Sequence, residues 1–168
     1  YTAEELTAAL AAGAGRARYD VFEPHYNVID RPKYEGAPED ACVKYKVGVV
    51  AYYALASGFL SGKYAPGQRF SDDDWRSRWT PEEIRARAEG ADRLAPLARG
   101  RTRGQAALRF CLEHPAVSTV IPGAKSPEQA RENAAAATAP AFSEAERRLI
   151  DAVVPPGRDL PIPQAAAS

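Results

Sequence analysis

Five helix N-terminal capping boxes constrain the fold of this 168-residue chain more than any other feature of its sequence. In such a box, a Ser or Thr side chain accepts a hydrogen bond from the first helical turn, and a Glu or Gln three residues later binds the N–H of the capping residue. The pattern predicts helices over 2–12, 81–98, 103–113, 126–137 and 143–153, and a weaker one over 38–46. The boxes are Thr2 with Glu5, Thr80 with Glu83, Thr102 with Gln105, Ser126 with Gln129, and Ser143 with Glu146.

Three short β-rich runs lie between these helices: YDVFE at 19–23, VGVVAYY at 47–53 and VSTVI at 117–121. The second and third runs are almost continuously apolar, which is typical of strands buried on both faces. Strands that alternate with helices form β/α units, so we expect three adjacent parallel strands in chain order. In such sheets, the chemistry is found at the carboxyl ends of the strands.

The predicted sheet is too small to close on itself. Three parallel strands with one helix layer form at most an incomplete wall, whose edge strands expose unpaired backbone groups. The chain also contains no methionine and begins at Tyr1. Together these features indicate part of a larger α/β fold. The Pro- and Ala-rich end from Pro155 onward has no helical or strand period, so we expect a docked or frayed tail.

Composition excludes several classes of protein. Lys plus Arg and Asp plus Glu are equal at 22 each, which argues against a nucleic-acid partner and requires any anion site to be local. No apolar run approaches the roughly 20 residues that cross a bilayer, and the start lacks a basic signal-peptide region, so we expect a cytoplasmic protein without a membrane partner. Cys42 and Cys111 lack CxxC spacing, which favours buried thiols over a disulfide or a metal site.

The loop after the third run offers a possible anion site. A Pro-Gly turn, Lys125 and a helix capped by Ser126 bring free backbone N–H groups, the positive end of a helix dipole and an ammonium together. Phosphate is the natural ligand of such a site, and the alternative is a solvated lysine at an ordinary turn. Asn133, further along the same helix, could bind a purine edge or be a surface polar residue.

The loop after the second run contains Ser57, Gly58 and Gly62, which let a ligand approach the backbone, and then Lys63. Tyr52 at the strand end could stack on a planar ring, although packing is the simpler role. The stretch 61–79 that follows is rich in Arg, Asp and Trp. It is either a charged linker or a long loop that closes over an anion.

Three further features favour plain structural roles. His25 follows a strand and can titrate near neutrality, but no Ser or Cys partner is evident, so we expect a structural or surface histidine. His114 lies at a helix end, where a cation suits the dipole. The run Asp72 to Asp74 lacks the spacing of a metal motif, and we expect it to be solvated.

Taken together, these stretches resemble the aldo-keto reductase family. EPHYNVIDR at 23–31 is similar to that family's QxxYNLLDR segment, VGVVAYYALASGFLSGKY at 47–64 to its GVxAYSPLASGxLTGKY segment, and HPAVSTVIPGAKSPEQARENAAAA at 114–137 to its HPxVxxVIPGxxSxEQxxENxxA segment. The resemblance covers residues 1–153 and leaves 154–168 as a tail. It implies the C-terminal part of a (β/α)8 TIM barrel, from the helix after the fifth strand onward, with the last three strands.

The resemblance implies a parent enzyme that reduces small carbonyl substrates by hydride transfer from NADPH, with the dinucleotide bound by this part of the barrel. The loop 61–79 would fold across the bound cofactor, with Arg69 on its phosphate and Asp72 to Asp74 in solvent. The residues implied are Tyr52 stacking on the nicotinamide, Leu55, Ser57, Gly58 and Lys63 along the pyrophosphate, Gly123, Lys125 and Gln129 on the adenosine phosphate, and Glu132 and Asn133 on the adenine.

The chain departs from the family pattern in three respects. Glu23 stands where the family has a Gln that binds the nicotinamide carboxamide, and a carboxylate there can accept from the amide N–H but cannot donate to its oxygen. Tyr53 and Ala54 replace a Ser-Pro pair. The family's catalytic Asp, Tyr, Lys and His come from the first four strands, so the resemblance assigns no catalytic residue and no metal ligand here.

Three functions follow from this reading. The leading one is the NADP(H)-binding portion of an oxidoreductase that is active only with its N-terminal half-barrel. The second is a non-catalytic nucleotide-binding or regulatory module, because some members of this family serve as channel partners. The third is a truncated remnant that self-associates through its open edges.

Overall fold

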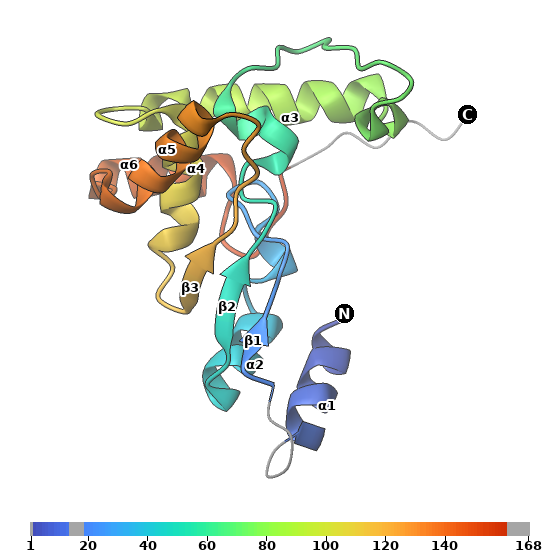
Figure 1. Ribbon diagram of the computed structural model, residues 1–168, viewed down its shortest axis with the longest axis vertical. Coiled ribbons are helices and arrows are strands. Elements are labelled where there is room, and N and C mark those ends of the chain that lie inside the picture. Colours follow the sequence, from blue (N-terminus) through green and yellow to red (C-terminus); the bar gives the residue numbers. More distant parts are fainter. Residues whose placement is uncertain (1, 14–18, 161–168) are drawn as a thin grey trace.

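The computed structural model describes residues 2–13 and 19–160 and shows an α/β fold built on three parallel strands. The strands are β1 (Val21–Phe22), β2 (Gly48–Ala51) and β3 (Val117–Val120), and they lie in the order β1-β2-β3 (Figure 1). The register pairs Phe22 with Val49 and Ala51 with Val120. The predicted parallel sheet in chain order is therefore confirmed.

Strand β1 is shorter than predicted because Pro24 interrupts its ladder. Proline has no N–H to donate at the position where β1 would next bond to β2. Its carbonyl still accepts from the N–H of Tyr52 at 3.0 Å, and a parallel bridge joins His25 to Tyr52. The pairing of the two strands thus extends past the proline to the carboxyl end of β2.

The described residues form six α-helices, and all but α2 (Ala37–Tyr45) begin at the capping boxes that the sequence predicts. Thr2, Thr80, Thr102 and Ser143 each accept from the N–H three residues later, and the matching Glu or Gln side chain binds back to the cap residue. The helices are α1 (Ala3–Gly13), α2 (Ala37–Tyr45), α3 (Pro81–Arg93), α4 (Arg103–Leu112), α5 (Pro127–Ala135) and α6 (Glu144–Val153).

Two helix predictions need correction. The single helix predicted over 81–98 ends at Arg93, and Ala95–Leu97 form a separate 3₁₀ turn, because Pro96 cannot continue an α-helix. The box at Ser126 is half formed. Ser126 Oγ accepts from the N–H of Gln129 at 3.2 Å, but the Gln129 side chain binds the N–H of Lys125 instead of that of Ser126.

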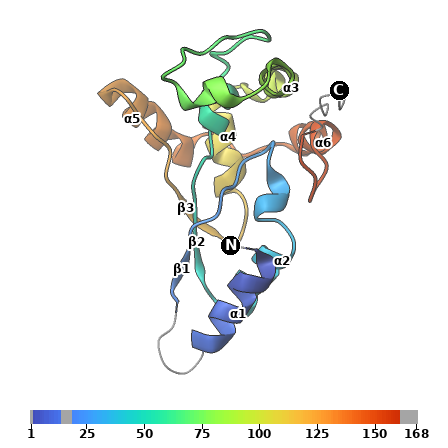
Figure 2. The same ribbon diagram turned by 90° about the vertical axis from the view of Figure 1, so that its right-hand side faces the viewer.

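The two faces of the sheet differ. Val49 and Ala51 of β2 are fully buried against α4 and belong to one hydrophobic cluster with Leu108 and Cys111. The opposite face carries the residues that alternate with them. Figure 2 shows the strands nearly edge on, with α2 and α6 on one side and α5 on the other, near the carboxyl ends of the strands. The exposed large apolar residues of this open face are Val21, Tyr52 and Ile121, with 58%, 41% and 47% of their surface exposed.

The expectation that β3 is buried on both faces is wrong. Ser118 and Thr119 are exposed, while Val117 and Val120 pack partly against the covered face. The apolar run alone could not distinguish a strand between two layers from one whose second layer is not present in the described residues.

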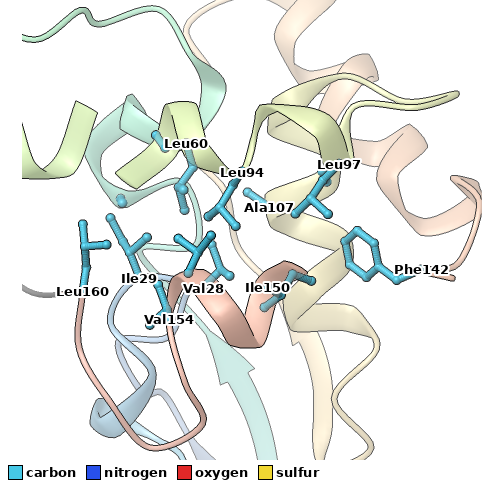
Figure 3. Close-up of a cluster of buried hydrophobic side chains, with 14 residues drawn as sticks. Val28, Ile29, Leu60, Leu94, Leu97, Ala107, Phe142, Ile150, Val154 and Leu160 are labelled. Atoms are coloured by element: carbon cyan, nitrogen blue, oxygen red, sulfur yellow. The ribbon is translucent and has the colours of Figure 1, made fainter. Parts of the chain in front are cut away.

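A second core lies above the covered face, between α3, α4, α6 and the segment after β1 (Figure 3). The last described residues are docked on this core, which was one of the two alternatives predicted for the tail. The N–H of Leu160 donates to the carbonyl of Ile29 at 2.9 Å, and its side chain lies against Gly90, where a Cβ would come within 2.4 Å of Leu160 Cδ2. Residues 161–168 lie outside the described part of the chain.

Both cysteines are buried free thiols, as predicted. Burial raises the pKa of Cys42 to about 11 and also raises that of Cys111, so both stay protonated at neutral pH. Within the described residues, the helices are all too short or too polar to traverse a lipid bilayer.

Candidate functional site

Tyr52 presents its ring on the open face, at the carboxyl end of β2. Its backbone is fixed on both sides, because its N–H donates to Pro24 and its carbonyl accepts from the N–H of Tyr26 at 3.1 Å. The His25 ring lies edge-on to it, with ring centroids 5.6 Å apart. An exposed aromatic face on a fixed backbone can stack on a planar ligand, which is the role predicted for Tyr52.

The backbone after Tyr52 makes a tight turn in an uncommon conformation. Tyr53, Ala56 and Ser57 have φ values of 62°, 46° and 56°, in the left-handed region that non-glycine residues rarely adopt. Ser57 Oγ donates to the Tyr53 hydroxyl at 2.8 Å, and this bond closes the turn. Strained backbone of this kind is often found at ligand sites.

Gly58 continues this turn at φ 92°, and only glycine suits its surroundings. A Cβ at this position would lie 2.6 Å from Lys63 Cε and 3.0 Å from Lys63 Nζ. The Lys63 ammonium therefore rests directly beside bare backbone. It also lies 5.1 Å from the centroid of the Tyr64 ring. The absence of a side chain at Gly58 lets the Lys63 ammonium lie against the turn, where it could bind a phosphate.

Leu55 begins the same turn, and its side chain packs partly into the protein. It is half-buried and packs against both hydrophobic cores, so a ligand could meet only the exposed part of its side chain or its backbone. Leu55 Cδ2 lies 3.9 Å from the position of a Cβ on Gly104, which places the turn against the start of α4.

The stretch 61–79 is an ordered loop and not a linker. Its centre is Arg76, whose guanidinium donates to the carbonyl of Ser57 at 3.1 Å and to the Tyr64 hydroxyl at 2.5 Å. The same guanidinium lies over the rings of Tyr64 and Phe70, at 5.0 and 4.3 Å from their centroids. The buried Phe59 anchors the loop from below, against Tyr64, Phe70 and Trp79.

Asp74 corrects the prediction that all three aspartates stay in solvent. Its side chain is 22% exposed and accepts from Arg76 Nε at 2.8 Å, from Arg76 Nη2 at 2.5 Å and from the Arg76 N–H. These hydrogen bonds lower the pKa of Asp74 to about 2, with a smaller contribution from the charge of Lys125. Asp72, Asp73 and the predicted phosphate ligand Arg69 are exposed.

The turn after β3 is held by the side chains predicted to hold an adenosine phosphate and an adenine. Gln129 Oε1 accepts from the N–H of Lys125 at 2.8 Å, and Asn133 Nδ2 donates to the carbonyl of Gly123 at 3.2 Å. Gly123 and Lys125 are exposed. The Lys125 ammonium is thus presented on a fixed turn, while Gln129 and Asn133 have partners within the protein.

Glu132 joins α5 to α4. Its carboxylate accepts from the hydroxyl of Thr102 at 2.6 Å, and its carbonyl accepts from Gln105 Nε2 at 3.1 Å. An adenine contact by Glu132 would have to compete with the bond to Thr102, the N-cap of α4. Sequence reasoning missed Thr102 as a partner because 30 residues separate the two side chains.

Sequence reasoning also missed the partners of His25. Nε2 of His25 lies 3.1 Å from Asp30 Oδ2, and the fully buried Asn27 donates to the same oxygen at 2.9 Å and to the carbonyl of Tyr53 at 3.2 Å. Burial disfavours the charged form of Asp30, but the hydrogen bonds from His25 and Asn27 outweigh it and lower its pKa. The signal was present, since all three residues belong to the segment HYNVID.

His114 has a structural role and lies away from this edge. It pairs with Glu39 of α2 at 3.3 Å, and its ring packs edge-on against the rings of Tyr26 and Tyr34. His114 therefore packs on the covered side of the sheet and is not part of the candidate site. Over residues 2–13 and 19–160, we find no cluster of three His, Cys, Asp or Glu side chains suited to a metal ion.

The candidate site is thus the carboxyl edge of the sheet. It combines the exposed Tyr52 ring, the bare backbone of Gly58, and the cations Lys63, Arg76 and Lys125. A planar ring bonded to phosphates would find a stacking surface and cationic donors here, so the chemistry of these residues fits a dinucleotide. Glu23 lies exposed at the end of β1, on the same edge.

One family model matches most of the chain. The family model described as "Aldo/keto reductase family" matches residues 1–155. A probable voltage-gated potassium channel subunit beta from Oryza sativa subsp. japonica is 32% identical over 120 residues, covering 67% of this chain and 37% of the rice protein. An L-glyceraldehyde 3-phosphate reductase from Escherichia coli (strain K12) is 31% identical over 139 residues, covering 78% of this chain and 40% of that protein.

Two solved structures share the fold. The glycerol dehydrogenase from Gluconobacter oxydans superposes with a TM-score of 0.70 at 24% identity, over 88% of this chain and 46% of that one. An aldo-keto reductase from Bacillus halodurans in its apo form gives 0.60 at 22% identity, over 93% and 49%. The chain therefore spans less than half the length of each of these relatives.

Proposed function

This chain belongs to the aldo/keto reductase family, and we propose that it forms the NADP(H)-binding C-terminal part of a (β/α)8 barrel oxidoreductase. The barrel transfers hydride between the nicotinamide and a small carbonyl or alcohol substrate. Residues 1–153 supply the last three strands and their helices, and 154–168 form a tail. The catalytic residues come from an N-terminal half-barrel, which completes the wall at the open edges of β1 and β3. We propose a cytoplasmic location.

One observation carries this proposal: an exposed aromatic ring and three cations lie along the same carboxyl edge. Tyr52 supplies the stacking face, and Lys63, Arg76 and Lys125 supply positive charge. The Arg76 guanidinium holds the loop 61–79 against Ser57, so the loop is already placed to cover a ligand at this edge. The half-length match to the relatives supports the view that the remaining part of the barrel lies outside this chain.

Within this proposal, some of the residues assigned from the sequence contact the cofactor, and others shape the site without contacting it. Tyr52, Ser57, Gly58, Lys63, Arg69, Gly123 and Lys125 contact the cofactor directly, and Glu23 binds the carboxamide. Gln129, Glu132 and Asn133 shape the turn after β3 and the start of α4, because each already has a partner in the protein. Leu55 acts through its backbone or the exposed part of its side chain. The cofactor supplies the hydride, and this chain binds and orients it.

The similarity to potassium channel beta subunits supports a second candidate. The rice relative is 32% identical to this chain, as is a relative from Arabidopsis thaliana. In this alternative, the same edge binds NADP(H), and the protein acts as a regulatory partner of another protein instead of turning over a substrate.

The test compares cofactor binding with turnover. The 168-residue chain and the complete barrel are titrated with NADPH, using the fluorescence of Trp75 and Trp79, the two tryptophans of the chain. We expect the complete barrel to bind NADPH and to oxidise it in the presence of aldehydes, and the chain alone to show no turnover. Binding without turnover in the complete barrel would favour the regulatory module. Saturable turnover by the repurified chain alone would contradict the half-barrel assignment.

A further inference from the structure

Charges of opposite sign lie at the two ends of the candidate site. The carboxylate of Glu23 is at the end of β1, on one side of Tyr52. The cations Lys63 and Arg76 lie in the segment that follows the carboxyl end of β2, and Lys125 follows β3. The sign of the charge therefore changes across the sheet, from β1 to β3.

Register places Glu23 and Tyr52 on the same open face. Phe22 pairs with Val49, and the bridge from His25 to Tyr52 keeps the same offset, so Glu23 lies beside Val50, two residues before Tyr52. Paired residues in a sheet point to the same face, and Glu23, Val50 and Tyr52 all belong to the face that carries the exposed side chains. From the spacing of strands and residues, the two positions are about 8 Å apart.

A second carboxylate, that of Asp30, lies near Tyr52. Asp30 contacts His25, whose ring touches that of Tyr52 edge-on, and its pKa is lowered by the hydrogen bonds described above, so it is ionised at neutral pH. The charged groups that face this end are Glu23, Asp30, His25 and Arg87. Arg87 acts on Asp30 from α3 and stacks on Trp79 at 4.5 Å. Because Asp30 is hydrogen-bonded to His25 and Asn27 and lies near Arg87, the carboxylate that faces a ligand on the open face beside Tyr52 is that of Glu23.

We propose that Glu23 makes this site select the oxidised form of the cofactor, NADP⁺, over NADPH; the inference rests on the proposed function. The two forms carry the same phosphates and differ in charge at the nicotinamide ring, which is positive when oxidised and neutral when reduced. Lys63, Arg76 and Lys125 therefore bind both forms equally. A carboxylate beside the ring attracts the oxidised form alone.

The selection has a consequence for the substrate. Binding the oxidised form more tightly lowers the reduction potential of the bound cofactor, by about 30 mV for each tenfold difference in affinity. A lower potential makes the bound NADPH a stronger hydride donor, so the equilibrium between the bound forms favours reduction of a carbonyl to the alcohol.

The experiment measures the affinities of NADP⁺ and NADPH by calorimetric titration of the complete barrel, with wild-type protein and with Glu23→Gln. Glutamine keeps the shape and removes the charge. From Coulomb's law at about 8 Å and an effective dielectric constant of about 20 to 50, we expect Glu23→Gln to weaken NADP⁺ roughly four- to thirtyfold. We expect NADPH to change less than about twofold. Glu144→Gln, on the exposed first turn of α6, is the matched control and should change neither affinity.

Three outcomes overturn the inference. Wild-type protein that binds NADPH as tightly as NADP⁺ removes the selection. An equal loss of both forms in Glu23→Gln assigns Glu23 to general cofactor contact, and leaves the proposed function intact. Wild-type protein that binds neither form overturns the proposed function together with this inference.

Discussion

The carboxylate of Asp74 binds the guanidinium of Arg76 through two hydrogen bonds, to Nε at 2.8 Å and to Nη2 at 2.5 Å. Because Arg76 also donates to the carbonyl of Ser57 and the hydroxyl of Tyr64, this pair connects the loop 61–79 to the turn after β2. A bidentate pair between aromatic rings orients the guanidinium as well as holding it. The loop is therefore fixed against the turn by contacts within the protein.

This ion pair makes the free energy of unfolding depend on pH between the folded-state and the ordinary pKa of Asp74. The folded-state pKa of Asp74, about 2, lies below its ordinary value of 3.8. Its stabilisation is therefore complete above about pH 4 and is lost as the pH falls toward 2. We expect Asp74→Asn to lower the urea midpoint at pH 7, with a difference from wild type that shrinks between pH 4 and 2. A difference independent of pH would contradict the pairing. The exposed neighbour Asp72→Asn should show no such dependence on pH.

Alanine substitutions at two glycines of the same loop region distinguish the effect of backbone strain from that of steric contact. Gly58 and Gly67 both have positive φ, 92° and 87°, but a Cβ meets Lys63 at Gly58 and meets nothing within 4 Å at Gly67. Each Ala substitution should cost about 1 to 2 kcal/mol from strain. We expect Gly58→Ala to cost more than Gly67→Ala in urea unfolding, and Gly58→Ala alone to weaken NADPH binding in the complete barrel. Equal costs and equal affinities would argue against a phosphate site beside Gly58.

The contact between Gly90 and Leu160 predicts that the effect of Gly90→Ala on the free energy of unfolding depends on the residue at position 160. Alanine is favoured over glycine in a helix by about 1 kcal/mol, but at position 90 of α3 its Cβ would meet Leu160 at 2.4 Å. We expect Gly90→Ala to be neutral or destabilising in the wild type, and stabilising by about 1 kcal/mol in Leu160→Ala. The free energies come from urea unfolding of all four proteins. The same effect in both backgrounds would show that Leu160 is not seated on α3.

Lys125 should set the preference for the phosphorylated cofactor. Its ammonium stands on a turn that Gln129 and Asn133 hold, and a charge-assisted contact to a phosphate contributes roughly 1.5 to 3 kcal/mol. In the complete barrel we expect Lys125→Ala to weaken NADPH by about tenfold to a hundredfold and to leave NADH nearly unchanged. Fluorescence titrations with both cofactors measure this. Equal losses would place Lys125 on the shared pyrophosphate or in support of the fold.

The open face and the edges of the sheet should make the isolated chain self-associate. Val21 on the edge strand β1 is 58% exposed, and unpaired edges bind other strands. We expect light scattering to show oligomers of the chain, and Val21→Lys to shift them toward the monomer. Val43→Lys provides a matched control, since Val43 is 62% exposed but lies on α2. A monomeric wild-type chain that binds no apolar dye would contradict the open sheet.

The sequence by itself determined the elements and their order. Capping at Thr80, Thr102 and Ser143 depends on residues three positions apart, so local chemistry is enough to predict where these helices begin. Strands that alternate with helices can form only a few arrangements, which is why the parallel order β1-β2-β3 was also predictable. Most of the residues of the candidate edge were identified in the same way, from the loops that follow the strands.

Tertiary structure alone decided which of those residues are free to meet a ligand. The carboxylate of Glu132 accepts a hydrogen bond from Thr102, 30 residues away, and Arg76 donates to the carbonyl of Ser57, 19 residues away. Likewise, nothing within the run VSTVI shows that one face of β3 is left uncovered. These facts depend on distances between segments that are far apart in the chain. Local pattern does not encode them, because the partner that satisfies a side chain is set by the packing of the whole fold.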